Sequence, residues 1–407
     1  MASDGAIAAA LQACVDRGEI AGAATAVWRQ GQMVDACAVG RRDIAAGLPV
    51  AHDTIFRIAS LTKPVTSLAA LQMIEEGRLA LDDPVARWAP EFAHSRVLNS
   101  PDGALDDTVP AQRAITIEDL LTHRSGLTYG AFHAGPIAQA YARALGGDID
   151  SAVAPDDWIA AAAQLPLIDQ PGASFNYGRS TDLLGLLLAR IDGAPLGAVL
   201  RRRVFDPLGM TDTGFAVPPG KRDRASKMYG FDDSGAMVAV GAHPAHDPAF
   251  LAERPTDMTY ESGGQGLWST CADYLAVARV FVEGGRPLLR RETLDLMTAN
   301  RLTPDQRAAA TMLGLPLFSG HGFGLGVAVV LDPDAADPLR CRGGIGTVGW
   351  PGAYGSWWQA DPTTGTAMVF LAHNALDLAQ AAQGIGLGIY GAIATFHALA
   401  SEIAAAP

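Results

Sequence analysis

Hydrophobic and polar positions follow two different periods along the chain, and the change between them separates strand-like ends from a helix-like middle. Near the start, Ala6–Asp16 has the spacing of a helix, whereas Ala21–Val27 and Met33–Val39 predict a hairpin that turns at Gln30-Gly31. Helical patterns then dominate to about residue 300, and the first of them is Ser60–Glu76. Long loops interrupt this helical region near residues 99–114, 131–136 and 218–260.

Strand-like patterns return in the last quarter of the chain. They occur at Gly324–Leu331, Thr347–Ala360 and Gly365–His373, and an apolar run at Gly384–Ala400 follows them. That run contains His397 and several glycines and is shorter than a membrane span, so we interpret it as a helix buried against a sheet. Strands at both chain ends, with helices between them, predict one sheet that is built from both termini and flanked by helices.

The same pattern predicts two lobes. A chain of 407 residues exceeds one typical domain, and 49% apolar residues can supply a large core. Residues 1–60 and 300–407 are predicted to form an α/β lobe, and residues 61–299 are predicted to form a mostly helical lobe inserted into it. Ligand sites commonly lie between such lobes, so we expect a single catalytic unit with its site in the cleft.

The stretch Ser60–Lys63 is the strongest chemical signal in the sequence. Ser60 and Lys63 lie three residues apart at the start of a predicted helix, where such positions share one face. A serine hydroxyl becomes a good nucleophile when a neighbouring base takes its proton, and a partly desolvated lysine amine is such a base. With 16 serines and three lysines, chance placement would give about 0.1 such pairs. The alternative is an ordinary helix start with Ser60 as a cap and Lys63 in solvent.

Two later segments strengthen the functional interpretation. Tyr177 follows a loop containing Pro, Gly and Asn and precedes the predicted helix Thr181–Ile191, so its hydroxyl can point into a cleft. Glycines interrupt the aromatic run Gly349–Trp358, and a glycine within a strand often marks the close approach of a ligand or another backbone. Each segment alone also fits a structural role, as a packing tyrosine or as an edge strand ended by Pro351. Their order after Ser60–Lys63 favours function.

Together these segments resemble the serine β-lactamase and penicillin-binding protein superfamily, and in particular its family VIII esterases, which are similar to class C β-lactamases. The resemblance extends over most of the chain. The segments that carry it are Phe56–Lys63, Leu81–Val85, Ile117–Leu127, Tyr177–Gly185, Phe205–Met210, Gly263–Thr270 and Trp350–Gly352. It implies a β-lactamase/transpeptidase-like α/β (α+β) fold with an antiparallel sheet and an inserted helical lobe.

The resemblance also implies roles for individual residues. Ser60 would be the nucleophile, and Lys63 and Tyr177 would share the proton transfers, although which of them is the base in acylation stays open. The backbone N–H groups of Ser60 and Ala353 would hold the oxyanion, because Ala353 follows Trp350–Gly352 as the family's oxyanion residue follows its own triad. Neither a cofactor nor a metal is expected for this chemistry.

Departures from the lactamase pattern concern substrate recognition. Trp350 stands in place of the lysine of the Lys-Thr-Gly triad, which removes a cation that would hold a carboxylate. Trp350, Pro351 and Gly352 are then expected to line the site, with Trp350 as an apolar wall. Arg179 stands in place of the asparagine of the class C Tyr-x-Asn motif, so the amide that helps to hold an acylamino group is missing.

Three further residues are assigned by their place in these motifs. Tyr177, Asp182 and Gly185 fit the Tyr-Ser-x-x-x-Asp-x-x-Gly register of family VIII esterases, and Asp182 is expected to support the site structurally. Tyr129 is a candidate for lining the cleft, with packing as the alternative. Arg179 is a candidate for substrate binding, because it could supply the missing cation from the other side of the cleft.

The predicted function is hydrolysis of short-chain or aryl carboxylic esters through an acyl-enzyme on Ser60, with acyl transfer to alcohols as a variant. The loss of anion recognition favours neutral esters. Within the superfamily, the alternative is a β-lactamase or a D-amino-acid amidase or peptidase. An alternative of another class is a non-catalytic, penicillin-binding-like protein, and the presence of Ser60, Lys63 and Tyr177 argues against it.

Composition limits the partners. A net charge of −13 argues against nucleic acid and anionic membranes, which leaves a small-molecule ester as the predicted partner and the oligomeric state open. The four cysteines have no metal-type spacing and favour free, mostly buried thiols, as in a reducing cytoplasm. No basic n-region and apolar h-region follow Met1, so no signal peptide is visible and a cytoplasmic location is expected.

Other chemistries have weaker support. No G-x-S-x-G, G-x-x-x-x-G-K-[ST] or H-E-x-x-H motif occurs, and the glycines of Gly384–Gly388 lie at the wrong end of the chain for a dinucleotide fold. His243, His246 and Asp247 occupy a Pro-rich loop, where solvation is favoured over metal binding. His123 is interpreted as a hydrogen-bonding residue at a helix end rather than as a triad base.

Overall fold

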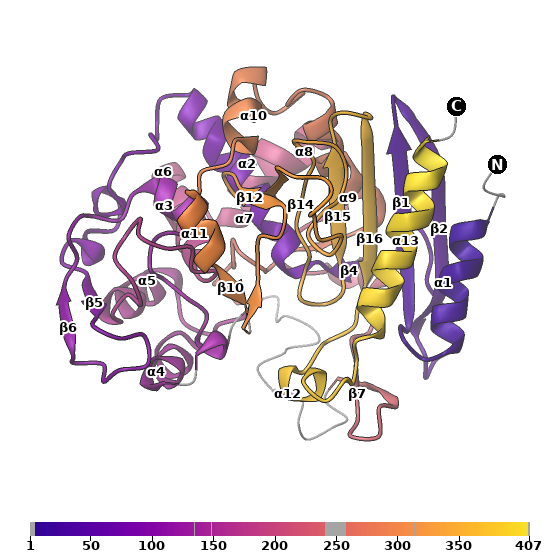
Figure 1. Ribbon diagram of the computed structural model, residues 1–407, viewed down its shortest axis with the longest axis horizontal. Helices are drawn as coiled ribbons and strands as arrows, with labels where there is room; N and C mark the ends of the chain where they lie inside the picture. The colour runs from indigo at the N-terminus through magenta and orange to yellow at the C-terminus, as the bar shows by residue number, and fades with distance from the viewer. Residues whose placement is uncertain (1–4, 134, 148, 241–257, 313, 406–407) are drawn as a thin grey trace.

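The computed structural model describes residues 5–133, 135–147, 149–240, 258–312 and 314–405. Its main sheet has eight strands, and all neighbouring strands are antiparallel (Figure 1). The strands in order across the sheet are β12 (His321–Phe323), β13 (Ala328–Val330), β14 (Val348–Gly349), β15 (Trp357–Asp361), β16 (Thr366–Ala372), β1 (Gly22–Arg29), β2 (Gln32–Asp43) and β3 (Leu48–Pro49).

Strands from the two ends of the chain meet in the middle of this sheet. β1 pairs with β16, with Ala23 opposite Ala372 and Arg29 opposite Thr366, and it pairs with β2 on its other side. The turn between β1 and β2 has Gln30 and Gly31 at φ values of 45° and 93°, the left-handed region that a tight two-residue hairpin uses. The predicted hairpin and the predicted sheet built from both termini are therefore confirmed.

Helices cover both faces of the sheet, because successive side chains of its strands point to opposite sides. Trp357 packs against α13 (Gly388–Ala405), which lies beside α1 (Ala6–Asp16) on one face (Figure 1). Trp358, the next residue, packs against Tyr274 and Phe281 of α9 (Cys271–Val282) on the other face. The predicted α/β (α+β) class and the predicted burial of a C-terminal helix against the sheet are confirmed.

The remaining elements lie mostly between the two strand-rich ends. α2 (Thr62–Glu75) follows a 3₁₀ turn at Ala59–Leu61 and is buried over most of its length, so its neighbours surround it. The other helices are α3 (Ile117–Leu121), α4 (Pro136–Leu145), α5 (Pro155–Gln164), α6 (Ser180–Asp192), α7 (Leu196–Leu200), α8 (Asp206–Leu208), α10 (Arg291–Thr298), α11 (Pro304–Ala309) and α12 (Leu378–Ala381). The small strand pairs are β4 (Phe56–Arg57) with β9 (Trp268–Ser269), β5 (Arg96–Leu98) with β6 (Thr108–Pro110), β7 (Tyr229–Phe231) with β8 (Met237–Ala239), and β10 (Thr311–Met312) with β11 (Leu315–Pro316).

Several predicted elements differ from the structure at their bounds. The run Thr347–Ala360 is two strands rather than one, because Pro351 lacks a backbone donor and Gly355, at φ 79°, turns the chain. The helix predicted at Gly384–Ala400 begins at Gly388 and extends to Ala405. The regions near residues 99–114 and 218–260 are not wholly loops, since they contain β6 and the β7–β8 hairpin.

The exact division into lobes stays a prediction. α9 falls within the range assigned to the helical lobe, yet it packs on the main sheet, so the helical region does not form a separate layer throughout. Among the described residues, no single helix has the length and apolar composition of a membrane span, although α6 and the segment Leu196–Leu208 meet that test as a pair bent by 80°.

Candidate active site

Two segments that are far apart in the sequence bring their polar atoms together at Ser60. The Ser60 Oγ accepts hydrogen bonds from the Lys63 Nζ at 3.1 Å and from the Tyr177 hydroxyl at 2.7 Å. Ser60 lies in the 3₁₀ turn before α2, and Ala59 precedes it at φ 45°, which is uncommon for a residue with a Cβ. Such backbone strain is often found at functional sites. The structure thus brings together the three residues predicted to carry the chemistry.

The Lys63 ammonium is buried and has three hydrogen-bond acceptors. Besides Ser60, these are the hydroxyl of Tyr129 at 3.2 Å and the carbonyl oxygen of Gly264 at 3.0 Å. An ammonium has three protons to donate, so this arrangement fixes the direction of each of them. The Nζ also lies over the ring of Tyr177, 4.6 Å from its centroid.

Asp182 holds the segment that supplies the Gly264 carbonyl. Its carboxylate accepts the N–H of Gly264 at 3.1 Å and a short hydrogen bond from the hydroxyl of Ser262. Asp182 is fully buried in the first turn of α6 and does not line the cavity at Ser60. This placement agrees with the structural role that the motif predicted, because Asp182 orients an acceptor for Lys63 rather than contacting substrate.

Tyr177 is fixed in position by Trp350. The indole Nε1–H of Trp350 donates to the Tyr177 hydroxyl at 2.9 Å, and the two rings lie 5.2 Å apart between centroids. The prediction gave Trp350 only the role of an apolar wall, whereas the structure adds a hydrogen bond to a second residue of the site. A donor at this position stabilises the tyrosine oxygen whenever that oxygen gains negative charge.

His123 supports the Tyr177 loop from behind. It follows the end of α3, its carbonyl accepts the N–H of Asn176 at 2.7 Å, and its Nδ1 accepts the N–H of Gly178 at 3.4 Å. A Cβ on Gly178 would meet the Thr128 backbone at 2.3 Å, so only glycine allows this close approach. Burial, together with the charge of Lys63, lowers the pKa of His123 well below its ordinary value. His123 is therefore a neutral positioning residue at a helix end.

A third segment approaches the nucleophile through a glycine. A Cβ on Gly352 would lie 2.7 Å from the carbonyl oxygen of Ile58, two residues before Ser60. The N–H of Gly352 donates to the Ser356 carbonyl at 2.6 Å and so closes the turn that carries Ala353. Ser60 and Ala353 line the same cavity. Their assignment as the two donors of an oxyanion hole stays a prediction.

A cavity of about 270 Å³ opens above Ser60. Aromatic and aliphatic side chains form most of its lining, as in many small-molecule sites. The lining residues are Ser60, Tyr129, Ala131, Phe132, Ile149, Tyr177, Gln265, Met312, Leu339, Arg340, Trp350, Pro351, Gly352, Ala353, Gly355, Asn374, Leu376, Leu378, Ile389, Tyr390 and Ile393. Tyr129, Trp350, Pro351 and Gly352 lie where the prediction placed them.

Arg179 does not reach this cavity. Its guanidinium is buried behind Tyr129, 5.2 Å from the centroid of that ring, and it donates to the carbonyl of Gly147 at 3.1 Å. Asp182 lies 3.7 Å from it. The predicted substrate contact of Arg179 is therefore not formed in the structure, because Tyr129 stands between its charge and the cavity.

Sequence reasoning missed the wall of the cavity that faces the catalytic residues. It consists of Arg340, Asn374 and the segment from Leu376 to the start of α13. Ile389 and Ile393 lie one helical turn apart, and Tyr390 adjoins Ile389. The sequence therefore indicated that these residues share a face of α13, but it did not indicate that this face points toward the cavity. Arg340 had no local motif that could have marked it.

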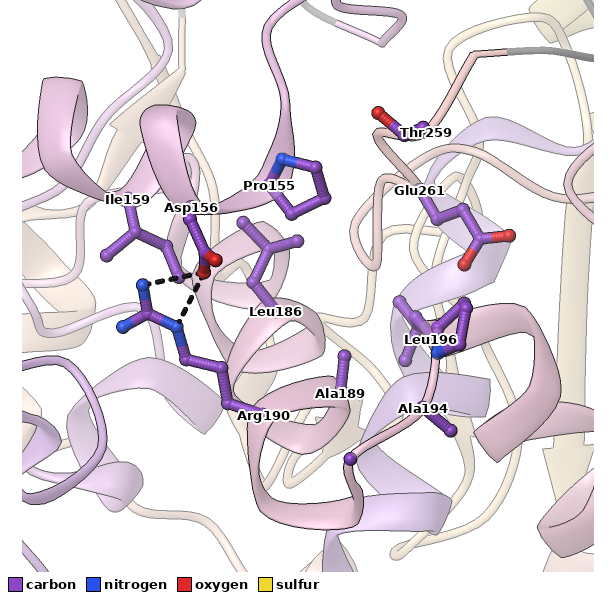
Figure 2. Close-up of a pocket in the computed structure, with 12 residues that line it drawn as sticks. Pro155, Asp156, Ile159, Leu186, Ala189, Arg190, Ala194, Leu196, Thr259 and Glu261 are labelled. Carbon is purple, nitrogen blue, oxygen red and sulfur yellow. Dashed lines mark hydrogen bonds and ion pairs between the residues drawn. The ribbon is translucent and has the colours of Figure 1, made fainter.

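A second cavity, of about 360 Å³, lies between α5, α6 and the start of α7 (Figure 2). It contains Arg190, whose guanidinium donates to Asp156 at 2.8 Å. Glu261 also borders it, and its carboxylate accepts the N–H of Gly197 at 2.7 Å. Among the described residues that line this cavity, no hydroxyl or thiol is hydrogen-bonded to a base in the way that Ser60 is.

Metal chemistry has no site among the described residues, where no group of three His, Cys, Asp or Glu side chains could hold an ion. His243, His246 and Asp247 lie outside the described residues. The four cysteines (Cys14, Cys37, Cys271 and Cys341) are buried and unpaired, as predicted.

The fold and the arrangement around Ser60 are those of a serine hydrolase-type enzyme with a β-lactamase-like fold, and a comparison of the sequence with family models agrees. The Beta-lactamase family model matches residues 7–385. This chain belongs to the β-lactamase family, and the resemblance inferred from its motifs is confirmed.

Individual relatives show which activities are named among the proteins that this chain is similar to. Esterase EstB of Burkholderia gladioli is 32% identical over 382 residues, which cover 91% of this chain and 91% of EstB. Lovastatin esterase of Penicillium rubens is 31% identical over 79% of this chain and 82% of its own. The solved structure of EstCE1, described as a hydrolase with promiscuous acyltransferase activity, superposes with a TM-score of 0.77 at 28% identity, covering 96% of this chain and 97% of its own. The similarity therefore includes esterases and extends over nearly the whole chain.

Proposed function

We propose that this chain is a serine carboxylesterase that forms an acyl-enzyme on Ser60 and releases the acyl group to water or to another alcohol. The observation that carries the proposal is the Ser60 Oγ held between the Lys63 Nζ and the Tyr177 hydroxyl at the floor of a mostly apolar cavity. A hydroxyl with two titratable neighbours within hydrogen-bond distance has the geometry of an activated nucleophile. The size and apolar lining of the cavity fit esters of short acyl chains or aryl alcohols.

In the first step, the Lys63–Tyr177 pair acts in the form that has one proton fewer, either a neutral Lys63 amine or a Tyr177 phenolate, and it takes the Ser60 proton while the Ser60 Oγ attacks the carbonyl carbon of the ester. The oxyanion that forms is held by the N–H groups of Ser60 and Ala353, which typically contribute about 3–4 kcal/mol each to such a transition state. The C–O bond to the leaving alcohol then breaks, and the alcohol oxygen takes the proton from the pair. The acyl group remains on Ser60.

In the second step, water or an acceptor alcohol attacks the acyl-enzyme. The Lys63–Tyr177 pair removes the proton of the attacking oxygen and returns it to the Ser60 Oγ as the acyl bond breaks. Trp350 donates to Tyr177 in both steps, so it stabilises the tyrosine oxygen each time that oxygen gains negative charge. Every proton and bond is accounted for by groups of this chain, the ester and the acceptor, so the proposal includes no cofactor.

The relatives support an ester substrate rather than a β-lactam. EstB and the lovastatin enzyme are named as esterases, and EstCE1 is described as a hydrolase that also transfers acyl groups. Trp350 occupies the position where lactamases have a cation, which argues against a β-lactamase or amidase. A non-catalytic binding protein would not need the hydrogen bonds that converge on Ser60.

A small-molecule ester is accordingly the proposed partner. The net charge of −13 supports this choice over nucleic acid or an anionic membrane surface. A cytoplasmic location stays a prediction from the sequence.

Replacement of Ser60 tests the proposal. Ser60→Ala should lower kcat/KM for p-nitrophenyl butyrate to the background rate, abolish labelling by a fluorophosphonate and leave the unfolding transition in place. Ser67→Ala is a matched control, because it removes another buried hydroxyl from α2. Wild-type turnover of the aryl ester should also far exceed that of a cephalosporin. Full labelling of Ser60→Ala would disprove the nucleophile, and equal rates on both substrates would disprove the substrate class.

A further inference from the structure

The cavity above Ser60 contains one formally charged lining residue among those the structure describes, and that residue is Arg340. In the part of the chain that the structure describes, no aspartate or glutamate lines the cavity with it. The protein as a whole carries a net charge of −13, so a single positive group facing an apolar cavity runs against its general composition. Such an arrangement calls for an explanation in terms of a ligand, since charged side chains are seldom desolvated unless they are paired.

The contacts of Arg340 leave its charge available to the cavity. Its guanidinium lies 5.6 Å from the centroid of the Trp350 ring, which faces Tyr177 on the same wall. Within the described part of the chain, it makes no ion pair at 4 Å or less and no side-chain hydrogen bond, and its Nε is buried. Burial lowers the pKa of Arg340, and the charge of Asp337 opposes this effect from beyond ion-pair distance.

We propose that Arg340 binds a carboxylate on the ester substrate, so that the preferred substrates are esters that carry a negative charge beside their acyl or alcohol part. The inference rests on the proposed esterase function and names its substrate class. A guanidinium matches a carboxylate with two parallel N–H donors, and the charge-assisted bonds so formed are about twice as strong as neutral ones.

This substrate class differs from the neutral esters that the replacement of the lactamase lysine by Trp350 suggested. The cation is missing at the position of the motif, but Arg340, in the segment before β14, introduces one into the cavity lining next to the Trp350 ring. Because Trp350 lies between Arg340 and Tyr177, the bound carboxylate would stand apart from the reacting carbonyl. Arg340 would thus bind and orient substrate, without taking part in the proton transfers.

Matched ester pairs test the proposal by kinetics. The p-nitrophenyl monoester of glutaric acid carries a carboxylate on its acyl chain, and p-nitrophenyl pentanoate is its neutral counterpart. For the alcohol side, the acetate ester of 4-hydroxyphenylacetic acid is compared with 4-ethylphenyl acetate. Wild-type kcat/KM should favour the charged member of at least one pair by about 10-fold or more, since a hydrogen bond to a charged group contributes that much to binding.

The variant Arg340→Met keeps an unbranched stem against Trp350 and removes the charge. It should abolish the preference for the charged ester by raising the KM of that ester, so that kcat/KM becomes similar for the two members of the pair. Arg340→Lys should recover part of the preference. Arg342→Met is the matched control, because Arg342 is exposed two residues away and does not line the cavity. It changes the net charge equally and should leave the preference unchanged.

Binding to an inactive background separates this proposal from the esterase proposal. In Ser60→Ala, the glutaric monoester should bind more tightly with Arg340 than with Met at that position, again by about 10-fold, as measured by calorimetry. No preference in the wild type, or a preference that survives Arg340→Met, overturns the role of Arg340. The wild type could also hydrolyse none of the four esters while binding of the charged ester still depends on Arg340. That result would overturn the esterase function and retain the carboxylate site.

Discussion

Two arginines, each at a cavity of similar size, have opposite electrostatic surroundings. Arg190 borders the cavity of Figure 2, where it donates to Asp156 at 2.8 Å and to Glu91 at 3.0 Å. Arg340 borders the cavity at Ser60, where no described carboxylate lies within ion-pair distance of it. The protein therefore neutralises one cation with its own side chains and leaves the other facing an apolar space.

The pKa shifts of the two groups have opposite signs. Burial lowers the pKa of Arg190, but the carboxylates of Glu91 and Asp156 more than offset it, so the net shift is upward. For Arg340, burial prevails and the pKa is lowered. A cation that is already paired has little capacity for a ligand, whereas a cation without a carboxylate partner, in a cavity of mostly apolar lining, can gain more from an anion. Size alone thus says little about which cavity is a site.

The largest expected difference between the two cavities concerns proton transfer. Lys63→Ala and Tyr177→Phe should each reduce kcat for an aryl ester by about 10²–10⁴-fold, the range for a lost acid–base group. The double variant should lose much less than the product of the single losses, because both residues act on the Ser60 proton. Steady-state kinetics of the four proteins measures this, and simple multiplication of the losses would show that the two residues do not share it.

The matched change in the other cavity is Arg190→Met. It removes a charge and several hydrogen bonds, yet it should leave kcat within about 2-fold. The cost should appear in stability as about 1 kcal/mol, since partly exposed ion pairs contribute little.

Trp350→Phe should have a smaller effect on the cavity at Ser60. It keeps an aromatic wall and removes the indole N–H that donates to Tyr177 at 2.9 Å. One lost hydrogen bond should reduce kcat about 10-fold with little change in KM. An increase in KM without a change in kcat would show that Trp350 acts only as an apolar wall for the substrate, as the sequence suggested.

Part of the site and of the fold could be predicted from the sequence. Ser60 and Lys63 were visible because their spacing is local, and Tyr177 and Trp350 were visible because family motifs surround them. The hairpin at Gln30-Gly31 followed from two strand-like runs and the short turn between them. These features depend on residues that are close in the chain or on a pattern that is shared with relatives.

What the sequence did not predict depends on long-range packing. Arg179 was assigned to the substrate because it adjoins Tyr177 in sequence, but Tyr129 separates its charge from the cavity. Arg340 reaches the cavity only because the turn before β14 brings it over Trp350. Trp350 was placed correctly, yet its hydrogen bond depends on an indole orientation that no periodicity encodes.

The smallest expected effect is the response of the two regions to acid. Burial, with the charge of Lys63, lowers the pKa of His123 well below 6.5, so the unfolded chain binds a proton there that the folded protein does not. Stability from this group is present above the unfolded value and is lost as the pH falls through about 6.5, by roughly 1 kcal/mol at pH 5.5. For Glu91, the Arg190 guanidinium lowers the pKa below 4.5, so that stability is lost only at lower pH.

His123→Asn tests this difference, because asparagine tolerates the φ of 54° found at this position and does not titrate. Denaturant unfolding at pH 7.5 and pH 5.5 should show a loss of stability on acidification that is smaller in His123→Asn than in the wild type by roughly 1 kcal/mol. Glu91→Gln should keep the wild-type difference between these two pH values. His123 would have to be protonated in the folded protein if His123→Asn and the wild type lost equal stability. In that case acid would not destabilise the protein through His123 at a higher pH than through Glu91.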